Sequence, residues 1–321
     1  MDPDADAAQL DYADRLEDMA TASSARQGRG GGGGRRGGRS GGSGGRGSRR
    51  EVDLSRALSR LLRHQAGNAG VELDREGFAC LDQVLQWGPI RSLAPTFAEI
   101  LNAVHNSDKQ RFAMKPNPAT NPDLDESSTD PSDWLIRANQ GHSIKLDSEH
   151  LLKPLALPSK EGDSSAAVPD GAVPVPPAVI HGTYFAFWPA IVASGGLKPM
   201  GRNHVHFSTG LPEDAEAGVI SGMRSDAEVL VYVDVAASIR DAAGIKWWMS
   251  DNGVVLTEGD ADRLVPLKYF REVVGRRQGV GVLWKDGEKA ADLPEGLKVR
   301  APQGKRGGGG GGGRGGRGRG R

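Results

Sequence analysis

The sequence predicts an α+β protein with a helical first lobe, a mainly β second lobe and disordered tails. Between residues 51 and 153, three segments with helical periodicity precede two alternating segments that indicate strands, the order of a winged-helix-like lobe. Residues 178–275 contain short apolar runs separated by glycine turns, which indicates a mainly β lobe. Residues 1–50 and 304–321 are acidic or Gly/Arg-rich and cannot bury enough apolar surface to fold.

The first lobe begins with a helix whose two faces differ in chemistry. At about 100° per residue, one side carries leucines that would face the core: Leu54, Leu58, Leu61 and Leu62. Arg56, Arg60 and Arg63 fall on the opposite side, with His64 at its edge. Most such faces are simply solvated. The alternative is a phosphate site, because Arg offers a rigid fork of donors and neutral His can relay a proton near pH 7.

The other expected elements of the first lobe follow this helix closely. Val71–Phe78 indicates a short strand and a glycine turn. Two further helices and the two strands of a wing come next: Leu81–Trp87, Thr96–His105, Lys109–Met114 and Trp134–Ala138. A polar loop over residues 116–132 would join the wing strands. Winged-helix lobes often bind nucleic acid, although a fold alone does not establish a function.

A stretch rich in Pro, Ala, Ser and Asp, residues 154–177, predicts a linker before the second lobe. A helix is expected at Phe185–Ser194. The expected strands are Val179–Thr183, His204–Ser208, Glu228–Asp234, Lys246–Ser250, Val254–Thr257 and Leu264–Val274. The turn Asp251–Gly253 would make a hairpin. Residues 276–303 give no clear pattern, and we treat them as an extension without a predicted structure.

Positive charge is concentrated in the tails. The formal net charge is zero, yet residues 26–50 carry eight Arg and residues 304–321 carry six Lys or Arg, with no acid in either segment. Gly/Arg tails commonly bind RNA weakly and with strong salt dependence, although they can also act only as solubilising segments. They are therefore the expected contact for a polyanion.

Cysteine content and hydropathy exclude several protein classes. The single Cys80 excludes an internal disulfide framework and a zinc site with several Cys ligands. The sequence shows neither a signal peptide nor a run of 18 apolar residues, so we expect an intracellular protein, cytoplasmic or nuclear, that has no membrane partner.

Basic side chains recur near the ends of the expected strands. They are Arg111, Arg137, His142, His181, His204, His206 and Arg224. Guanidinium groups from separate elements repel one another, so a cluster of them is favoured where an anion neutralises it. Each lone His can equally be structural. His204 and His206 alternate and could ligate a metal, but no nearby carboxylate or Cys completes the site, so we expect none.

Seven short motifs occur in the order seen in a known enzyme family. They are LLRH (61–64), DKQRF (108–112), RANQGHS (137–143), IHGT (180–183), RNHVHFS (202–208), SGMR (221–224) and SDNGVVL (250–256). On these motifs, residues 51–275 resemble the NAD-dependent tRNA 2′-phosphotransferases. The tails, the loop at 116–132 and the linker fall outside the resemblance.

The resemblance implies a winged-helix-like RNA lobe at 51–153 and an ADP-ribosyltransferase-like NAD lobe at 178–275. It implies that an internal RNA 2′-phosphate attacks C1″ of NAD and expels nicotinamide, after which the 2″-hydroxyl attacks that phosphate. The products would be RNA with a 2′-hydroxyl and ADP-ribose 1″,2″-cyclic phosphate. NAD would be a co-substrate, the partner would be spliced tRNA, and guanidinium groups would take the place of a metal. We expect a monomer.

The resemblance also assigns roles to individual residues. The catalytic set would be Arg63 and His64, which orient the RNA phosphate, and Arg111, Arg224 and Lys109, which stabilise the second step. The NAD site would include His181, Gly182, Thr183, Arg202, His204, His206 and Ser221. RNA would contact Arg56, Arg60, Arg137, Gln140 and His142.

Two alternatives stay open at this stage. One is an enzyme of the same fold that ADP-ribosylates a terminal nucleic-acid phosphate, or a protein, and stops there. Protein-modifying ADP-ribosyltransferases usually carry a catalytic Glu late in the fold, and the nearby candidate, Glu258, is expected in a turn. The other is a non-catalytic RNA-binding protein that uses its tails.

Overall fold

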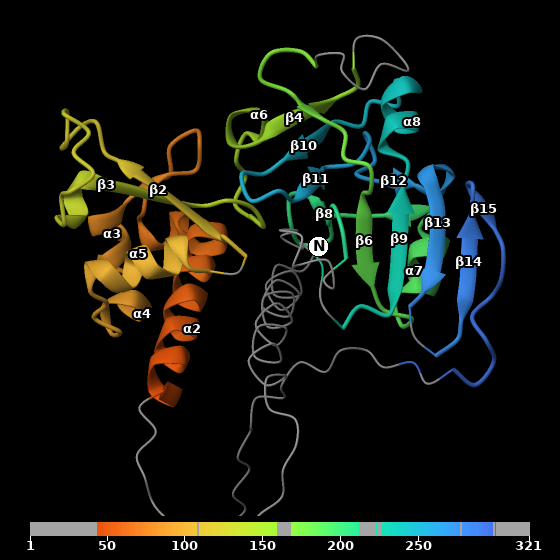
Figure 1. The fold of residues 1–321 in the computed structure, drawn as a ribbon, viewed down its shortest axis with the longest axis horizontal. Coiled ribbons are helices and arrows are strands. Elements are labelled where there is room, and N and C mark those ends of the chain that lie inside the picture. Colours follow the sequence, from red (N-terminus) through yellow and green to blue (C-terminus); the bar gives the residue numbers. More distant parts are fainter. Residues whose placement is uncertain are drawn as a thin grey trace, which may run out of the picture.

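The structure is a computed structural model that describes residues 44–107, 109–158, 168–211, 223, 226–276, 278–297 and 299. These residues form helices and several sheets, which confirms the mixed α+β class (Figure 1). The predictions for the tails fall outside the described residues, except that the first helix begins at Gly44, inside the range expected to be disordered. No helix in the described part of the chain is long and apolar enough to cross a membrane.

The first lobe, taken here as the described residues up to 147, packs helices against a small antiparallel sheet. Its helices and helical turns are α2 (Gly44–Arg60), η1 (Leu61–Gln65), η2 (Gly67–Ala69), α3 (Leu81–Gln86), α4 (Gly88–Arg91), α5 (Phe97–His105) and η3 (Pro131–Asp133). The sheet has the order β1 (Ala79–Cys80), β3 (Trp134–Ala138), β2 (Phe112–Pro116). Figure 1 shows this lobe on the left of the view, with α2 in orange.

Local sequence explains where these elements begin. The predicted leucine stripe of α2 and η1 is buried, from Leu54 to Leu62, and forms the centre of the first-lobe core. Helix α5 begins with a capping box, in which the Thr96 hydroxyl accepts from the Glu99 backbone N–H and the Glu99 carboxylate accepts from the Thr96 N–H. The expected 116–132 loop is tied to the start of β3, because the Trp134 indole donates to the Ser128 carbonyl oxygen at 2.9 Å.

The strand predicted at Val71–Phe78 is wrong. The Asp74 carboxylate accepts backbone N–H groups from Glu76 (2.9 Å) and Phe78 (2.8 Å), which curls the chain into a turn. Gly77 completes that turn with φ of 80°. The strand β1 begins only afterwards.

The second lobe, taken as the described residues from 148 on, contains two five-stranded sheets. One has the order β5 (Val173–Pro174), β4 (Lys153–Ala156), β10 (Trp247–Met249), β11 (Val255–Thr257), β8 (Val205–Phe207). The other has the order β15 (Glu288–Lys289), β14 (Gly281–Lys285), β13 (Phe270–Gly275), β9 (Val229–Val233), β6 (Ile180–Thr183). A two-stranded sheet pairs β12 (Val265–Pro266) with β7 (Gly196–Leu197). The helices and turns are α6 (Ser148–Leu151), α7 (Trp188–Ala193), α8 (Val235–Arg240) and η5 (Leu267–Tyr269).

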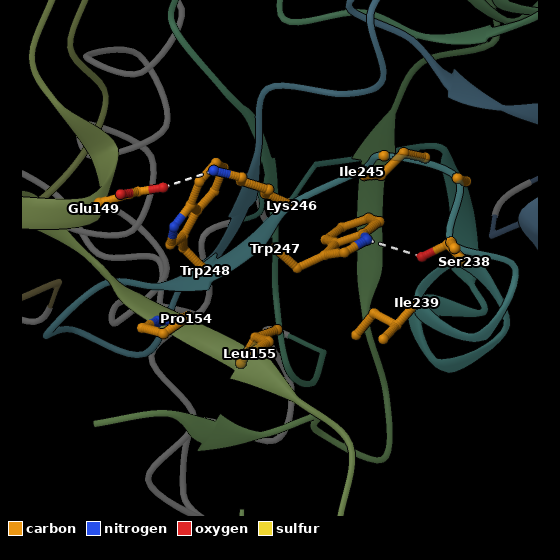
Figure 2. A pocket seen from close by; sticks show the side chains of 12 residues that line it. Glu149, Pro154, Leu155, Ser238, Ile239, Ile245, Lys246, Trp247 and Trp248 are labelled. Atoms are coloured by element: carbon orange, nitrogen blue, oxygen red, sulfur yellow. Dashed lines mark hydrogen bonds and ion pairs between the residues drawn. The ribbon is translucent and has the colours of Figure 1, made fainter. Parts of the chain in front are cut away.

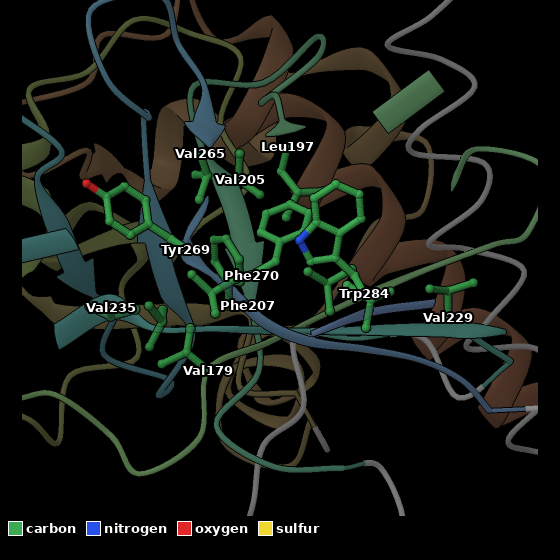
Figure 3. Packing of buried hydrophobic residues seen from close by; sticks show 14 of the residues in the cluster. Val179, Leu197, Val205, Phe207, Val229, Val235, Val265, Tyr269, Phe270 and Trp284 are labelled. Atoms are coloured by element: carbon green, nitrogen blue, oxygen red, sulfur yellow. The ribbon is translucent and has the colours of Figure 1, made fainter. Parts of the chain in front are cut away.

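Two segments differ from their sequence-based description. The ends of the expected linker are strands, because β4 and β5 pair in parallel at Leu155 and Val173 and join the first of these sheets. Residues after 275 continue the second sheet as β14 and β15. The Trp284 ring of β14 packs edge-on against Trp188 of α7, with 6.2 Å between ring centroids, and so belongs to the second-lobe core (Figure 3).

Candidate active site at the boundary between the lobes

Arg63 is buried at the end of the first helix. It lies in the π-helical turn η1, and its side chain is 2% exposed. Its carbonyl oxygen accepts backbone N–H groups from Ser143 (3.0 Å) and Ile144 (3.2 Å). The prediction that Arg63 shares a solvent-side face with Arg56 and Arg60 is therefore wrong for Arg63, because another segment covers it. Single π turns inside helices occur often at functional sites.

The covering segment is Arg137–Ser143, which we call the RANQGHS segment. Gly141 has φ of 89°, and a Cβ atom added there would lie 3.4 Å from the Arg63 guanidinium. Glycine therefore suits both the backbone conformation and the close approach of Arg63. His64 Nδ1 lies 2.8 Å from the Ser143 hydroxyl oxygen. The RANQGHS segment thus holds both residues of the predicted phosphate-orienting pair.

His142 lies at the centre of a cationic cluster. It is 2% exposed, and burial lowers its pKa to about 3, with further lowering from Arg63, His64, His204 and Arg137. The ring is therefore neutral at physiological pH. Its Nε2 atom has no hydrogen-bond partner among the described residues. The arrangement concentrates positive charge around a neutral imidazole, which is favourable where an anion binds.

Arg137 connects this cluster to the second lobe. Its guanidinium donates to the Glu76 carbonyl oxygen at 2.8 Å and to the Asp251 carboxylate at 2.5 Å. It also lies over the Phe78 ring, 4.6 Å from the centroid. Arg137 is 8% exposed. Because it bonds Glu76 of the first lobe and Asp251 of the second, it joins the two lobes. Sequence reasoning missed Asp251 as its partner, although the hairpin turn that carries it was predicted.

The Lys109–Arg111 turn is bonded to the same segment. The Asn139 backbone N–H donates to the Arg111 carbonyl oxygen at 2.9 Å. The half-buried Arg111 guanidinium donates to the Ser107 hydroxyl at 3.1 Å. The RANQGHS segment therefore brings the Arg63–His64 turn and the Lys109–Arg111 turn together. Arg224 and Ser221, the other residues predicted near this site, lie outside the described residues.

In the second lobe, His181 is held in one tautomer. Its Nδ1 atom lies 2.9 Å from the His206 carbonyl oxygen, which can only accept, so Nδ1 carries the proton. In the neutral form of the ring, Nε2 is then the acceptor. Glycine fits position 182, because a Cβ there would lie 2.3 Å from Cγ of Met223 and would force that side chain to move. Thr183 is buried at the end of β6.

His204 takes part in a buried polar network. It precedes β8, is 4% exposed, and its Nε2 lies 2.9 Å from the Ser148 hydroxyl oxygen. Ser148 donates to the Glu258 carboxylate at 2.6 Å, so the predicted turn residue Glu258 takes part in a polar network. Burial lowers the pKa of His204 to about 4, although Glu258 opposes this shift. Sequence reasoning missed Ser148, for which no motif gave a signal.

The remaining predicted residues are exposed or half-buried. Arg60 is exposed, and the half-buried Arg56 lies 3.7 Å from Asp53 of the same helix. Gln140 and Arg202 are half-buried, and the Arg202 carbonyl oxygen accepts from Arg263 at 3.0 Å. Among the described residues, no three His, Cys, Asp or Glu side chains gather as a metal site requires.

A cavity of about 470 Å³ lies elsewhere, between α8, β4 and β10 (Figure 2). Trp247 and Trp248 line it, and the Lys246–Glu149 ion pair closes one side at 2.6 Å. None of the predicted site residues that the structure describes lines this cavity. We therefore locate the candidate active site from the hydrogen bonds at the lobe boundary and not from this cavity.

A family model described as "RNA 2′-phosphotransferase, Tpt1 / KptA family" matches residues 49–259. The chain belongs to this family. It is therefore a transferase enzyme, and the resemblance inferred from the motifs is confirmed. Strands β13, β14 and β15 lie beyond the matched residues, although they complete the second-lobe sheet.

Curated relatives carry the same description. The chain is 39% identical over 229 residues to tRNA 2′-phosphotransferase 1 of Bos taurus, which covers 71% of this chain and 77% of the relative. It is 35% identical over 257 residues to tRNA 2′-phosphotransferase 1 of Mus musculus, covering 80% and 90%. It is 33% identical over 228 residues to tRNA 2′-phosphotransferase of Saccharomyces cerevisiae, covering 70% and 84%.

Proposed function

We propose that the protein completes tRNA splicing by transferring the internal 2′-phosphate of ligated tRNA to NAD. In the first step, a 2′-phosphate oxygen bonds to C1″ of NAD and the bond to nicotinamide breaks. In the second step, the 2″-hydroxyl oxygen bonds to phosphorus, its proton leaves, and the RNA 2′-oxygen departs and is protonated. The products are 2′-hydroxyl RNA, ADP-ribose 1″,2″-cyclic phosphate and nicotinamide.

One structural observation carries this proposal beyond family membership. The Arg63–His64 turn and the Lys109–Arg111 turn, distant in sequence, are both hydrogen-bonded to the RANQGHS segment at the lobe boundary. Two basic turns held this way suit a phosphate dianion, since their mutual repulsion is relieved when an anion binds between them.

The lobes divide the substrates in this proposal. The first lobe is a winged-helix-like RNA module, supported by its helices and the antiparallel β2–β3 wing. The second lobe is an ADP-ribosyltransferase-like NAD module, supported by its two sheets and the glycine of β6. Arg56, Arg60 and Gln140 would contact RNA beyond the reacting phosphate, and Arg137 and His142 would shape the site beneath it.

The catalytic roles follow from charge. Arg63 and His64 would hold the 2′-phosphate in line with C1″, and correct positioning can contribute several kcal/mol to a reaction of this type. Arg111, Lys109 and Arg224 would stabilise the charge that develops on the phosphoryl oxygens in the second step. The cationic surroundings of His142 favour that same charge.

The second-lobe residues fit a dinucleotide. His181, with Nδ1 committed to the His206 carbonyl oxygen, presents Nε2 as an acceptor for a ribose hydroxyl. Gly182 and Thr183 would present the backbone of β6 to the nicotinamide amide. Arg202, His204, His206 and Ser221 would line the same site. The protein would act as a monomer inside the cell, in the cytoplasm or the nucleus.

The test uses the full-length protein, NAD and an RNA oligonucleotide with one internal 2′-phosphate. Mass spectrometry should detect ADP-ribose 1″,2″-cyclic phosphate and 2′-hydroxyl RNA, with one nicotinamide released per RNA. The same oligonucleotide without the 2′-phosphate is the control and should release no nicotinamide above background.

Other outcomes would identify the alternatives. An RNA that stays ADP-ribosylated, without cyclic phosphate, would indicate an ADP-ribosyltransferase that stops after one step. RNA retention without any nicotinamide release would indicate a binding protein and would contradict the proposal.

A further inference from the structure

The tip of the β10–β11 hairpin reaches across the lobe boundary to the Lys109–Arg111 turn. Asn252, at this tip, is 3% exposed, and its side-chain Nδ2 donates to the Lys109 carbonyl oxygen at 2.9 Å. This bond joins residues 143 positions apart. The SDNGVVL motif that contains Asn252 supported the resemblance, but nothing above gives its asparagine a role.

The orientation of the Asn252 amide is fixed within the hairpin. The Ser250 hydroxyl donates to Asn252 Oδ1 at 2.7 Å, so Oδ1 faces Ser250 and Nδ2 faces Lys109. Gly253 has φ of 75°, and its N–H donates to the Ser250 carbonyl oxygen at 2.9 Å, which closes the tip. The position requires a side chain that accepts on one side and donates on the other, as an amide does.

On the first-lobe side, three successive carbonyl oxygens of the turn are held by asparagines. Lys109 is held by Asn252, Gln110 by the Asn139 side chain at 2.8 Å, and Arg111 by the Asn139 backbone N–H at 2.9 Å. Gln110 has φ of 40°, a left-handed conformation that is unfavourable for a residue with a Cβ and persists only where surrounding contacts impose it.

These bonds determine where the turn directs its basic side chains. Lys109 and Arg111 flank Gln110, so a change in the Gln110 backbone angles would reorient both. Asn139 belongs to the same lobe as the turn, whereas Asn252 belongs to the lobe assigned to NAD. Asn252 therefore relates the turn to the lobe assigned to NAD.

We propose that Asn252 is a positioning residue for the second step, which sets Lys109 and Arg111 of the RNA lobe against the phosphoryl group attached to the dinucleotide sugar. This proposal rests on the proposed two-step function. Asn252 acts through the Lys109–Arg111 turn and touches no reacting atom. Its loss affects the second step more than the first, because the phosphate-orienting pair, Arg63 and His64, is held by other bonds.

The experiment compares Asn252→Asp with Asn203→Asp. Asn203 makes a matched bond across the same boundary, since its Nδ2 donates to the Ile144 carbonyl oxygen at 2.7 Å, away from the Lys109–Arg111 turn. Both substitutions keep the shape of the side chain and replace its donor with an acceptor that faces a carbonyl oxygen. A general loosening of the boundary would therefore affect both variants alike.

The measurement is single-turnover reaction of the full chain with NAD and a 2′-phosphorylated oligonucleotide, which follows nicotinamide release and the ADP-ribosylated RNA intermediate separately. Asn252→Asp should slow decay of the intermediate about tenfold, the size of one hydrogen bond worth about 1.4 kcal/mol, while nicotinamide release stays within about twofold. Asn203→Asp should not slow decay of the intermediate selectively, because its bonds adjoin the segment that holds Arg63 and His64 and not the Lys109–Arg111 turn.

The outcomes separate the two proposals. A wild-type protein that releases no cyclic phosphate would contradict the proposed function itself. Wild-type turnover with equal intermediate levels in both variants would overturn the role of Asn252 alone. Should Asn252→Asp fail to fold, Ser250→Ala replaces it, because it removes the hydroxyl that orients the amide. This hydroxyl also bonds the Val254 backbone, so the stability of the variant is measured beside its kinetics. Ser250→Ala should accumulate more ADP-ribosylated intermediate than wild type, but less than the amount expected for Asn252→Asp. A wild-type level of intermediate in Ser250→Ala would also overturn the proposal.

Discussion

The two sides of the lobe boundary differ in charge. The first-lobe side gathers basic groups, with Arg63, Arg137 and His142 nearly fully buried. The second-lobe side supplies an acid and an amide at one hairpin tip, Asp251 and Asn252, which bond to Arg137 and to the Lys109 carbonyl oxygen. The RANQGHS segment and the Lys109–Arg111 turn thus each receive a hydrogen bond or ion pair from the second lobe.

This difference explains why the two lobes act as a unit. Buried charge is costly unless it is paired, and the pairing of Arg137 crosses the boundary. Arg63 is packed against Gly141 of its own lobe. Arg137 therefore contributes to lobe association, whereas the proposed function gives Arg63 the role of orienting the RNA phosphate, and substitutions should separate the two roles.

The largest effect is expected for Arg63→Ala. Loss of this guanidinium removes a preorganised donor for the phosphate, so kcat/KM should fall about 100- to 1,000-fold. Steady-state nicotinamide release with the 2′-phosphorylated oligonucleotide measures it. Arg91→Ala, which truncates an exposed Arg in α4, is the matched control and should stay near wild type. Equal losses in both variants would contradict a specific role for Arg63.

A second large effect, confined to one step, is expected for Arg111→Ala. The second step should slow about 100-fold, because charge develops on the phosphoryl oxygens there. Quenched-flow samples should contain ADP-ribosylated RNA, and Arg224→Ala should behave alike. Recovery of unreacted substrate only, without this intermediate, would remove Arg111 from the second step.

A moderate loss of stability is expected for Asp251→Ala. It leaves the buried Arg137 without its carboxylate, which should lower the free energy of unfolding by about 1–3 kcal/mol, as measured by urea unfolding. Glu149→Ala is the control, because it breaks the exposed Lys246 ion pair and should lower stability far less than Asp251→Ala. Similar values for the two variants would show that the boundary pair contributes no more than a surface pair.

The smallest change in the free energy of unfolding at neutral pH is expected for His204→Gln. In acid the difference between this variant and the wild type should grow. The pKa of His204 is about 4 in the folded protein, below its ordinary value near 6.5, so the unfolded chain binds the proton more tightly. Stability is then lost as pH falls between these two values. From pH 7 to pH 5 the wild type should lose about 2 kcal/mol more than His204→Gln.

Urea unfolding followed by tryptophan fluorescence at both pH values measures this difference. The Gln amide can still bond the Ser148 hydroxyl, so the two proteins should be similar at pH 7. Parallel loss of stability in both proteins would show that His204 does not titrate as its burial requires.

Local sequence was sufficient where an element depends on its own residues. The leucine stripe of α2, the Thr96–Glu99 capping box of α5 and the Trp134–Ala138 strand follow from periodicity and capping alone. The strand predicted within Val71–Phe78 was wrong because one carboxylate, Asp74, curls the segment, whereas the glycine turn predicted there is present at Gly77. The strands β14 and β15 were not predicted, since β14 is buried through Trp284 against Trp188 of α7, a residue distant in the chain, and β15 only pairs with β14.

The sequence by itself determined the family, the α+β class and the residue types needed for phosphate chemistry, because ordered motifs and periodic apolar residues are properties of the chain. Only the tertiary structure decided that Arg63 is buried beneath the RANQGHS segment and that Asn252 holds the Lys109 carbonyl oxygen. Such contacts join residues about 80 to 140 positions apart. No local pattern encodes them, because they form only when separate elements pack and bury one another's polar groups.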